Sequence, residues 1–307
     1  MPAMSALLAV GVIDFSTYRG KQGAAMGDGR ISRRTMLTAG ATGLALTGGG
    51  LVSLLRSSGG GGASPGSYLS LRGIERVRSR ARNRDVDLVT MLPRKEVPIG
   101  LPVCLVLHGL GGDAVGTHKY GFDARLVREV ALGTTPPFAL VAVDGGDNYW
   151  NQVRPGDDPM AMLLDELPVW LRERGLADRP FACAGVSMGG FGALYYARMR
   201  AERHQPLRAT AVASPALITS WAVMRTRRIF PSREAWEALD PLRHPHAIGN
   251  SALGVWCGED DPFVTGTRRF ISMTQPKVAY IGPGGHTADF VEGVADDVVR
   301  FLGQHAT

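Results

Sequence analysis

Cysteine is scarce in this sequence, and its scarcity argues against a disulfide-stabilised protein and against a cysteine-ligated metal site. There are three cysteines in 307 residues, at Cys104, Cys183 and Cys257. An odd number of thiols argues against a disulfide framework, and their spacing suits no metal site. Each falls inside a predicted core strand, where a thiol acts as a small apolar side chain. We therefore expect three buried, unreactive thiols, no disulfide and no metal.

Lysine is almost as scarce, so arginine carries most of the net charge of +6. Part of the excess lies in residues 72–84, where arginines alternate with other residues. This alternation predicts an edge strand whose charges face water, with residues 86–92 as its hairpin partner. The run lacks the interleaved aromatic residues of nucleic-acid-binding modules, so we expect no nucleic-acid partner. Anionic envelope lipid fits this charge better.

A long uninterrupted apolar run is also missing. Residues 37–55 are apolar but diluted by threonine and glycine, which argues against a stable membrane span. They follow the hexapeptide SRRTML at residues 32–37, which matches the core of a twin-arginine export signal. We expect export by this route to the cell envelope or the extracellular space. Peripheral membrane association, or anchoring by an uncleaved signal, is an open alternative.

The sequence divides into four segments. No internal repeat is visible, and about 240 residues remain beyond the leader, enough for one α/β domain with a large core. We expect an unstructured N-terminal segment at residues 1–31, with Met26 as an alternative start, and a twin-arginine segment at residues 32–56. A flexible glycine and serine linker at residues 57–67 and one α/β domain at residues 68–304 follow.

The most informative stretch is the pentapeptide GVSMG at residues 185–189. It follows a short apolar run and precedes a run of helix formers, residues 190–200. A Gly-x-Ser-x-Gly between a strand and a helix is typical of a nucleophile elbow, so tight a turn that a Cβ at Gly185 or Gly189 would collide with a neighbouring element. The alternative is a chance match in a chain with 40 glycines. We expect Ser187 to be a nucleophile.

A serine needs a base and a carboxylate, which follow it in the order acid, then histidine, in this arrangement. The predicted strand 251–257 breaks into an acidic turn, where Asp261 is expected to be the acid because it precedes a proline-capped helix. Asp260 and Glu259 are the alternatives. Asp261 could instead be only the N-cap of the helix that starts at Pro262.

The predicted base is His286. A short β-rich run, residues 276–281, opens into the glycine- and proline-rich loop GPGGH at residues 282–286, and a helical stretch follows over residues 289–302. A histidine on such a loop can reach over the elbow. The other histidines lie in less suitable places, and His108 has a different expected role.

That role is to order an oxyanion loop. Residues 101–107 form an almost wholly apolar strand, as expected when helices cover both sheet faces, and the strand ends in HGLGG at residues 108–112. We expect the backbone N–H of Leu110, or alternatively of Gly111, to bind an oxyanion together with the N–H of Met188. A phosphate cradle is a poor alternative, because the loop lacks the Lys-Ser/Thr of a nucleotide-binding loop.

Together these motifs resemble those of α/β-hydrolase serine esterases. Within that superfamily they are similar to the branch of esterase D, feruloyl esterases and the mycobacterial mycolyltransferase antigens. The resemblance covers about residues 68–302 and rests on HGLGG, VDGG, GVSMGGFG and GGH at residues 108–112, 143–146, 185–192 and 284–286. It implies a mostly parallel sheet with helices on both faces, and ester hydrolysis or acyl transfer at Ser187 without a cofactor. The aromatic residue after the histidine, Phe290, stands in a shifted register.

The expected substrate is a small-molecule or lipid ester. A cap-like insertion is predicted at residues 215–250, and its Trp221, with Trp150 on the opposite wall, could contact an acyl or aryl group. Both tryptophans could equally be core residues. We predict an exported serine carboxylic-ester hydrolase that works through an acyl-enzyme. The alternatives are an acyltransferase with the same three residues and a non-catalytic envelope protein on the same scaffold.

Overall fold

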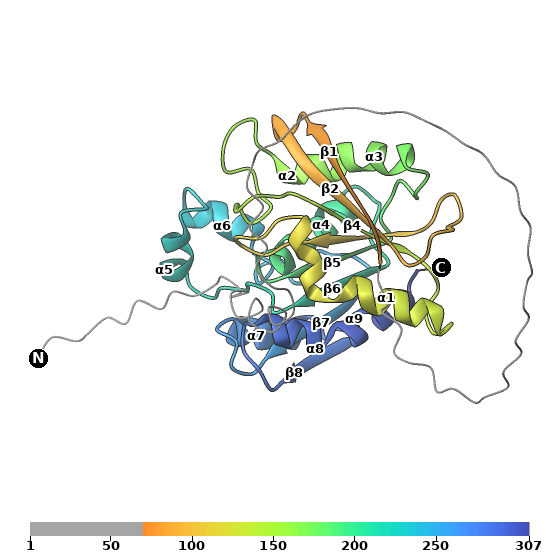
Figure 1. The fold of residues 1–307 in the computed structure, drawn as a ribbon. Helices are drawn as coiled ribbons and strands as arrows, with labels where there is room; N and C mark the ends of the chain where they lie inside the picture. The colour runs from red at the N-terminus through yellow and green to blue at the C-terminus, as the bar shows by residue number, and fades with distance from the viewer. Residues whose placement is uncertain (1–69, 307) are drawn as a thin grey trace, which may run out of the picture. The chain divides into compact units, whose positions relative to one another are not determined.

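An eight-stranded sheet organises the computed structural model, which describes residues 70–306. The strand order is β1-β2-β4-β3-β5-β6-β7-β8 (Figure 1). β2 is antiparallel to β1 and β4, and the other neighbours are parallel, which confirms the predicted fold class. The strands are β1 (Leu71–Ser79), β2 (Arg84–Leu92), β3 (Val103–Leu107), β4 (Ala139–Val143), β5 (Ala182–Val186), β6 (Ala209–Ala213), β7 (Ala252–Gly258) and β8 (Val278–Gly282).

All of these elements lie within the predicted domain, residues 68–304. The predicted segments 1–31, 32–56 and 57–67, and with them the twin-arginine motif, lie outside the described residues. Within residues 70–306, no helix combines the length and the apolar character needed to span a bilayer.

Helices cover both faces of the sheet, as predicted. Figure 1 shows α1, α8 and α9 on one side of the sheet and α2 and α3 on the other. The predicted final helix is divided in two at Val294, between α8 and α9. The helical elements are η2 (Val115–Tyr120), α1 (Phe122–Ala131), α2 (Pro159–Ala161), η3 (Met162–Glu166), α3 (Leu167–Glu173), α4 (Met188–Glu202), α5 (Trp221–Met224), η4 (Arg225–Arg227), α6 (Arg233–Leu239), α7 (Val264–Thr274), α8 (Ala288–Gly293) and α9 (Ala295–Gly303).

The central strands are apolar on both sides because each side meets a helical layer. In β3, Val103 and Leu105 pack into the core of one face, and Cys104 and Val106 into the core of the other. This is the two-face alternation of a strand in a doubly covered sheet. All three cysteines are buried and free, as the sequence predicted.

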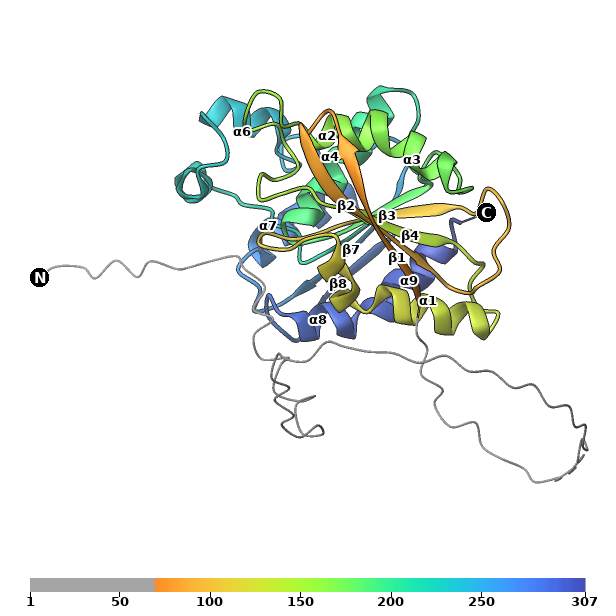
Figure 2. The same ribbon diagram turned by 45° about the horizontal axis from the view of Figure 1, so that its top comes forward.

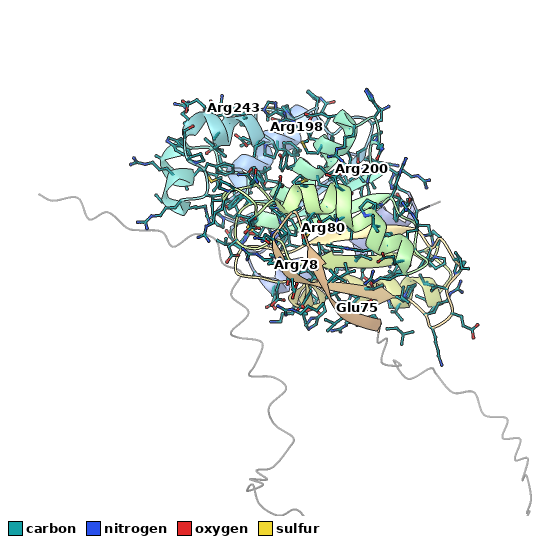
Figure 3. The ribbon with its side chains drawn as sticks, turned by 90° about the horizontal axis from the view of Figure 1, so that it is seen from above. Glu75, Arg78, Arg80, Arg198, Arg200 and Arg243 are labelled. Atoms are coloured by element: carbon teal, nitrogen blue, oxygen red, sulfur yellow. The ribbon has the colours of Figure 1, made fainter. Side chains whose placement is uncertain are left out.

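The arginine-rich run forms the edge hairpin that its alternation predicted. β1 lies at the edge of the sheet, and the opposed pairs Arg76–Asp87 and Arg78–Asp85 form cross-strand ion pairs of 3.5 Å. Figure 3 shows Arg78 on this hairpin. One arginine departs from the prediction. Arg82, in the turn between the strands, is only 2% exposed, so it does not face water.

The insertion between β6 and β7 packs against the core of one face of the sheet. It contains α5, η4 and α6, and Figure 2 shows α6 set to the side of the sheet. Trp221 stacks on the buried Trp236 with ring centroids 6.0 Å apart. Met224 and Phe230 are also buried. The Phe230 ring lies 6.3 Å from the rings of Tyr149 and Phe191, so the insertion is anchored to the main core.

A buried carboxyl group, that of Asp240, lies at the end of the last helix of this insertion. Asp240 follows α6, is 2% exposed, and accepts a hydrogen bond of 3.0 Å from the Leu242 N–H. Burial raises the pKa of Asp240 to about 6. Because the folded pKa is raised, the stabilising contribution of this group is complete below its unfolded value of 3.8 and is lost as the pH rises through about 6.

We therefore expect Asp240→Asn to gain stability relative to the wild type as the pH rises. The free-energy difference between the two proteins should grow by about 2 kcal/mol from pH 4 to pH 8, because only the wild type must ionise a buried carboxyl. Urea unfolding of both proteins at pH 4, 6 and 8 measures this difference. A difference that is constant with pH would show that folding does not raise the pKa of Asp240.

Candidate active site

The strand–turn–helix at Ser187 has the strained geometry of an elbow. β5 ends at Val186, α4 begins at Met188, and Ser187 between them has φ 58° and ψ −120°. An added Cβ at Gly185 would lie 2.0 Å from the Gly189 carbonyl oxygen, and one at Gly189 would lie 2.0 Å from that of Leu107. These contacts confirm the predicted reason for both glycines.

The structure brings the three predicted catalytic side chains together. His286 Nε2 lies 2.9 Å from Ser187 Oγ, and His286 Nδ1 lies 2.8 Å from Asp261 Oδ2. Each residue comes from the C-terminal end of a different strand, β5, β7 or β8. The imidazole is thus placed between a hydroxyl and a carboxylate, the arrangement in which it can accept a proton from one while held by the other.

Asp261 is well suited to remain ionised. Burial raises its pKa, but hydrogen bonds from His286 and from the Phe263 N–H more than compensate, so the pKa of Asp261 is lowered. Its second oxygen accepts the Phe263 N–H at 2.8 Å, which orders the start of the next helix. Asp261 is thus the histidine partner. It is not the helix N-cap, because α7 begins at Val264 rather than at Pro262 and its N-cap position is Phe263. The alternatives Asp260 and Glu259 are exposed.

Two close contacts fix the loop that carries His286. An added Cβ at Gly258, which ends β7, would lie 2.2 Å from the Gly284 carbonyl oxygen, so only glycine lets the acid turn and the histidine loop approach this closely. The Phe263 ring packs edge-on against the His286 ring at 5.0 Å. The side chain of His286 therefore contacts both Asp261 and the Phe263 ring.

In the oxyanion loop, the N–H of Leu110 is better placed than the N–H of Gly111 to bind an oxyanion. The Gly111 N–H donates to Asp147 Oδ1 at 2.6 Å, so this alternative donor is already engaged. Within residues 70–306, the backbone N–H groups of Leu110 and Met188 have no hydrogen-bond acceptor. They are the two donors that the sequence singled out, and both remain available to a developing oxyanion.

His108 orders this loop, as expected. Its Nε2 accepts the Gly145 N–H at 2.9 Å, and its Nδ1 lies 2.8 Å from the Gly109 carbonyl oxygen, to which it donates. Burial lowers the pKa of His108, which favours this neutral form. The side chain thereby ties the loop after β3 to the loop after β4.

The prediction that Trp150 lines the substrate pocket is wrong. The residue is 0% exposed, and its indole fills the space that a Cβ would need at Gly145 or at Gly192. Its Nε1 donates to the His108 carbonyl oxygen at 3.4 Å. Trp150 therefore supports the oxyanion loop from the core of the domain. Trp221 is partly exposed on α5, and its contact with substrate stays a prediction.

Two carboxylates near this loop have roles that the sequence did not predict, although one of them belongs to the VDGG motif at residues 143–146. Asp144 accepts the Ala114 N–H at 2.9 Å and the Asp87 N–H at 3.0 Å, and Asp147 accepts the Gly111 N–H. The signal was the position of these residues directly after an apolar strand, where side chains reach the active edge of the sheet. Among the described residues, no group of three or more histidine, cysteine or acidic side chains is placed to hold a metal ion.

Fold and site together define the class, an esterase of the α/β-hydrolase fold. The family model described as "Putative esterase" matches residues 79–274, and the chain therefore belongs to that esterase family. A comparison with curated protein sequences finds no match.

Solved esterase structures share the fold. A ferulic acid esterase superposes with a TM-score of 0.64 at 19% identity, over 77% of this chain and 99% of its own. An S-formylglutathione hydrolase from Agrobacterium tumefaciens gives a TM-score of 0.63 at 15% identity, over 78% and 97%. MPT51 from Mycobacterium tuberculosis gives 0.57 at 17% identity, over 74% and 98%. At these identities the likeness establishes the fold alone.

Proposed function

We propose that this enzyme hydrolyses carboxylic esters through an acyl-enzyme intermediate at Ser187. The observation that carries the proposal is the contact of 2.9 Å between Ser187 Oγ and His286 Nε2 at a strained elbow. His286 takes the hydroxyl proton while Ser187 Oγ bonds to the ester carbonyl carbon. The carbonyl oxygen becomes an oxyanion, held by the N–H groups of Leu110 and Met188.

The second half of the cycle uses the same groups. His286 returns its proton to the departing alcohol as the carbon–oxygen bond breaks, and Asp261 stabilises the intervening imidazolium. Water, deprotonated by His286, then attacks the acyl-enzyme and releases the acid and free Ser187. An acceptor alcohol in place of water would make the same residues an acyltransferase.

Product analysis separates these two outcomes. We expect free acid to be the main product from a short 4-nitrophenyl ester, even with glycerol or a sugar present at millimolar concentration. Mass spectrometry of the products measures the ratio of acid to new ester. A main product that contains the added alcohol would identify an acyltransferase and contradict the hydrolase proposal.

We also propose that the enzyme is exported to the cell envelope or beyond by the twin-arginine route. The support is the SRRTML hexapeptide at residues 32–37, followed by a glycine-diluted apolar run. Replacing Arg33 and Arg34 with lysine should leave the chain inside the cell. Fractionation followed by immunoblotting would show this, and undiminished export of the variant would contradict the proposal.

A further inference from the structure

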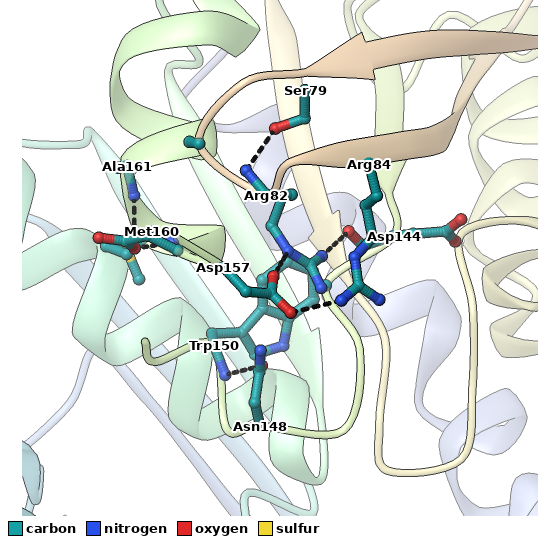
Figure 4. Close-up of polar contacts among 12 residues, drawn as sticks. Ser79, Arg82, Arg84, Asp144, Asn148, Trp150, Asp157, Met160 and Ala161 are labelled. Carbon is teal, nitrogen blue, oxygen red and sulfur yellow. Dashed lines mark hydrogen bonds and ion pairs between the residues drawn. The ribbon is translucent and has the colours of Figure 1, made fainter. Parts of the chain in front are cut away.

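A cavity of about 290 Å³ lies beside the oxyanion loop, and arginines dominate its charged lining. Its walls come from three parts of the chain: the β1–β2 hairpin, the segment after β4, and the insertion. Figure 4 shows the guanidinium groups of Arg82 and Arg84 converging on Asp157. The charged lining residues are Arg82, Arg84, Arg154, Arg228, Asp147 and Asp157.

The two aspartates in this cavity are already engaged. Asp157 pairs with Arg82 Nε and, at 2.7 Å, with Arg84 Nη2, and Asp147 accepts the Gly111 N–H. Within residues 70–306, Arg154 and Arg228 form no ion pair. Four arginines against two aspartates leave the cavity with an excess of positive charge.

The buried arginine gives this cavity a fixed floor. Arg82 is 2% exposed, and its Nη1 donates to the Asp144 carbonyl oxygen at 2.6 Å. Glu166 holds the hairpin turn that carries Arg82, because it accepts hydrogen bonds from the N–H groups of Arg80 and Ala81 at 2.8 and 3.0 Å. A guanidinium held in this way loses little side-chain entropy when it meets an anion.

Hydrogen bonds connect the wall of this cavity to the loop that carries Leu110 and, through the next residue, to the side chain of Met188. Asp147 in its wall bonds to Gly111, the residue next to Leu110. Asn148, also in the wall, precedes Tyr149, whose N–H lies 3.4 Å from the sulfur of Met188. The segment after β4 therefore links this cavity to the oxyanion loop, toward which an ester bound at Ser187 would extend.

The insertion directs two successive arginines to this region. Arg228 has φ 56° at the end of η4, and its side chain lines the cavity. The preceding Arg227 places its guanidinium 6.0 Å from the Tyr149 ring and 5.7 Å from the Phe263 ring. Phe263 in turn contacts His286. Positive charge thus extends from the cavity to the reaction centre.

We propose that this cavity binds an anionic group, a carboxylate or phosphate, carried by the ester substrate, with Arg154 and Arg228 as specificity-determining residues. The proposal rests on ester hydrolysis at Ser187. A guanidinium matches both oxyanions through parallel N–H donors. The substrate class is therefore an ester with a negative charge on its acyl or its alcohol part.

Matched substrate pairs test the proposal. In the acyl arm, the half-esters of glutaric and suberic acid with 4-nitrophenol are compared with the pentanoate and octanoate esters. In the alcohol arm, 4-acetoxyphenylacetate is compared with 4-ethylphenyl acetate. The Arg154→Ala/Arg228→Ala variant should lose about ten-fold or more in kcat/KM, through KM, for the charged members of one arm. Its kcat/KM for the neutral members should stay within about two-fold of wild type.

The control is Arg225→Ala. Arg225 is an exposed arginine of the same segment and does not line the cavity. Its replacement should leave kcat/KM unchanged for both the charged and the neutral substrate of each pair. Arg228→Lys should retain part of the preference. Equal losses for charged and neutral members, or no loss in either arm, would overturn the proposal.

A binding measurement keeps this test independent of catalysis. At constant ionic strength, inorganic phosphate should raise the Tm of the wild type and of Arg225→Ala, but not of the double variant. If the wild type cleaves no ester yet shows this shift, the hydrolase proposal fails and the anion site stands. Equal shifts in all three proteins, or none, would overturn the anion site.

Discussion

Ser187→Ala should lower kcat for a short 4-nitrophenyl ester by about 10⁶-fold, because no other group can form the acyl-enzyme. Among the described side chains the hydroxyl forms a hydrogen bond only with His286, so its removal should leave the fold intact. Hydrolysis is followed at 400 nm or thereabouts, and circular dichroism with a melting curve checks the fold. A fluorophosphonate should label the wild type at Ser187 and leave the variant unlabelled.

A matched serine variant makes this result specific. Ser272→Ala removes an exposed hydroxyl on α7 and should retain full activity and full labelling. Labelling of the Ser187→Ala protein, or a peptide map that places the label on another serine, would remove Ser187 as the nucleophile. Unlabelled wild type would point instead to a site that cannot activate its serine.

Asp261→Asn should lower kcat by about 10⁴-fold, the second largest effect that we expect. The carboxylate holds His286 Nδ1–H at 2.8 Å, and a carboxamide would favour the wrong tautomer or orientation of the ring. Because the pKa of Asp261 is lowered, its contribution should be intact at every pH above its ordinary value of 3.8 and fail only in stronger acid.

The neighbouring acid supplies the matched control. Asp260→Asn removes the same charge from the adjacent, exposed residue, and should change kcat by less than about two-fold. Steady-state kinetics of the two variants, with melting curves, measure the contrast. A larger loss in Asp260→Asn than in Asp261→Asn would transfer the role of the acid to Asp260.

The sequence predicted the parts of the site that depend on local structure. Ser187, Asp261 and His286 each follow a strand, and parallel strands bring their C-terminal ends to one edge of the sheet. Glycine and proline patterns marked each of the three turns. The distance between strands along the chain did not matter, because the sheet order is set by the fold class.

Trp150 shows where this local reasoning stops. Its side chain points into the core because Tyr149 and Trp150 both adopt positive φ, 55° and 58°, which no sequence pattern indicated. The space that receives it exists only because Gly145, five residues earlier, and Gly192, distant in sequence, lack a Cβ. An aromatic residue after a strand could therefore be placed near the site, but not oriented.

Arg82 shows a second limit. Alternation correctly placed the arginines of β1 toward water, since it depends only on the period of a strand. Arg82 belongs to the turn, where that period ends, and its acceptors are Asp157 and the carbonyl of Asp144. The cavity that it floors could not be anticipated, because its walls meet only in the folded chain.

The separate origin of these walls bears on how the enzyme could diversify. The elbow, the acid turn and the histidine loop are built into the central sheet, where the glycine contacts leave almost no freedom. Arg154 and Arg228 of the cavity come instead from a surface loop and an insertion at the periphery. Substitutions there leave the sheet untouched. The fold thus separates the catalytic residues, which the sheet fixes in place, from peripheral residues that can be replaced to change the substrate.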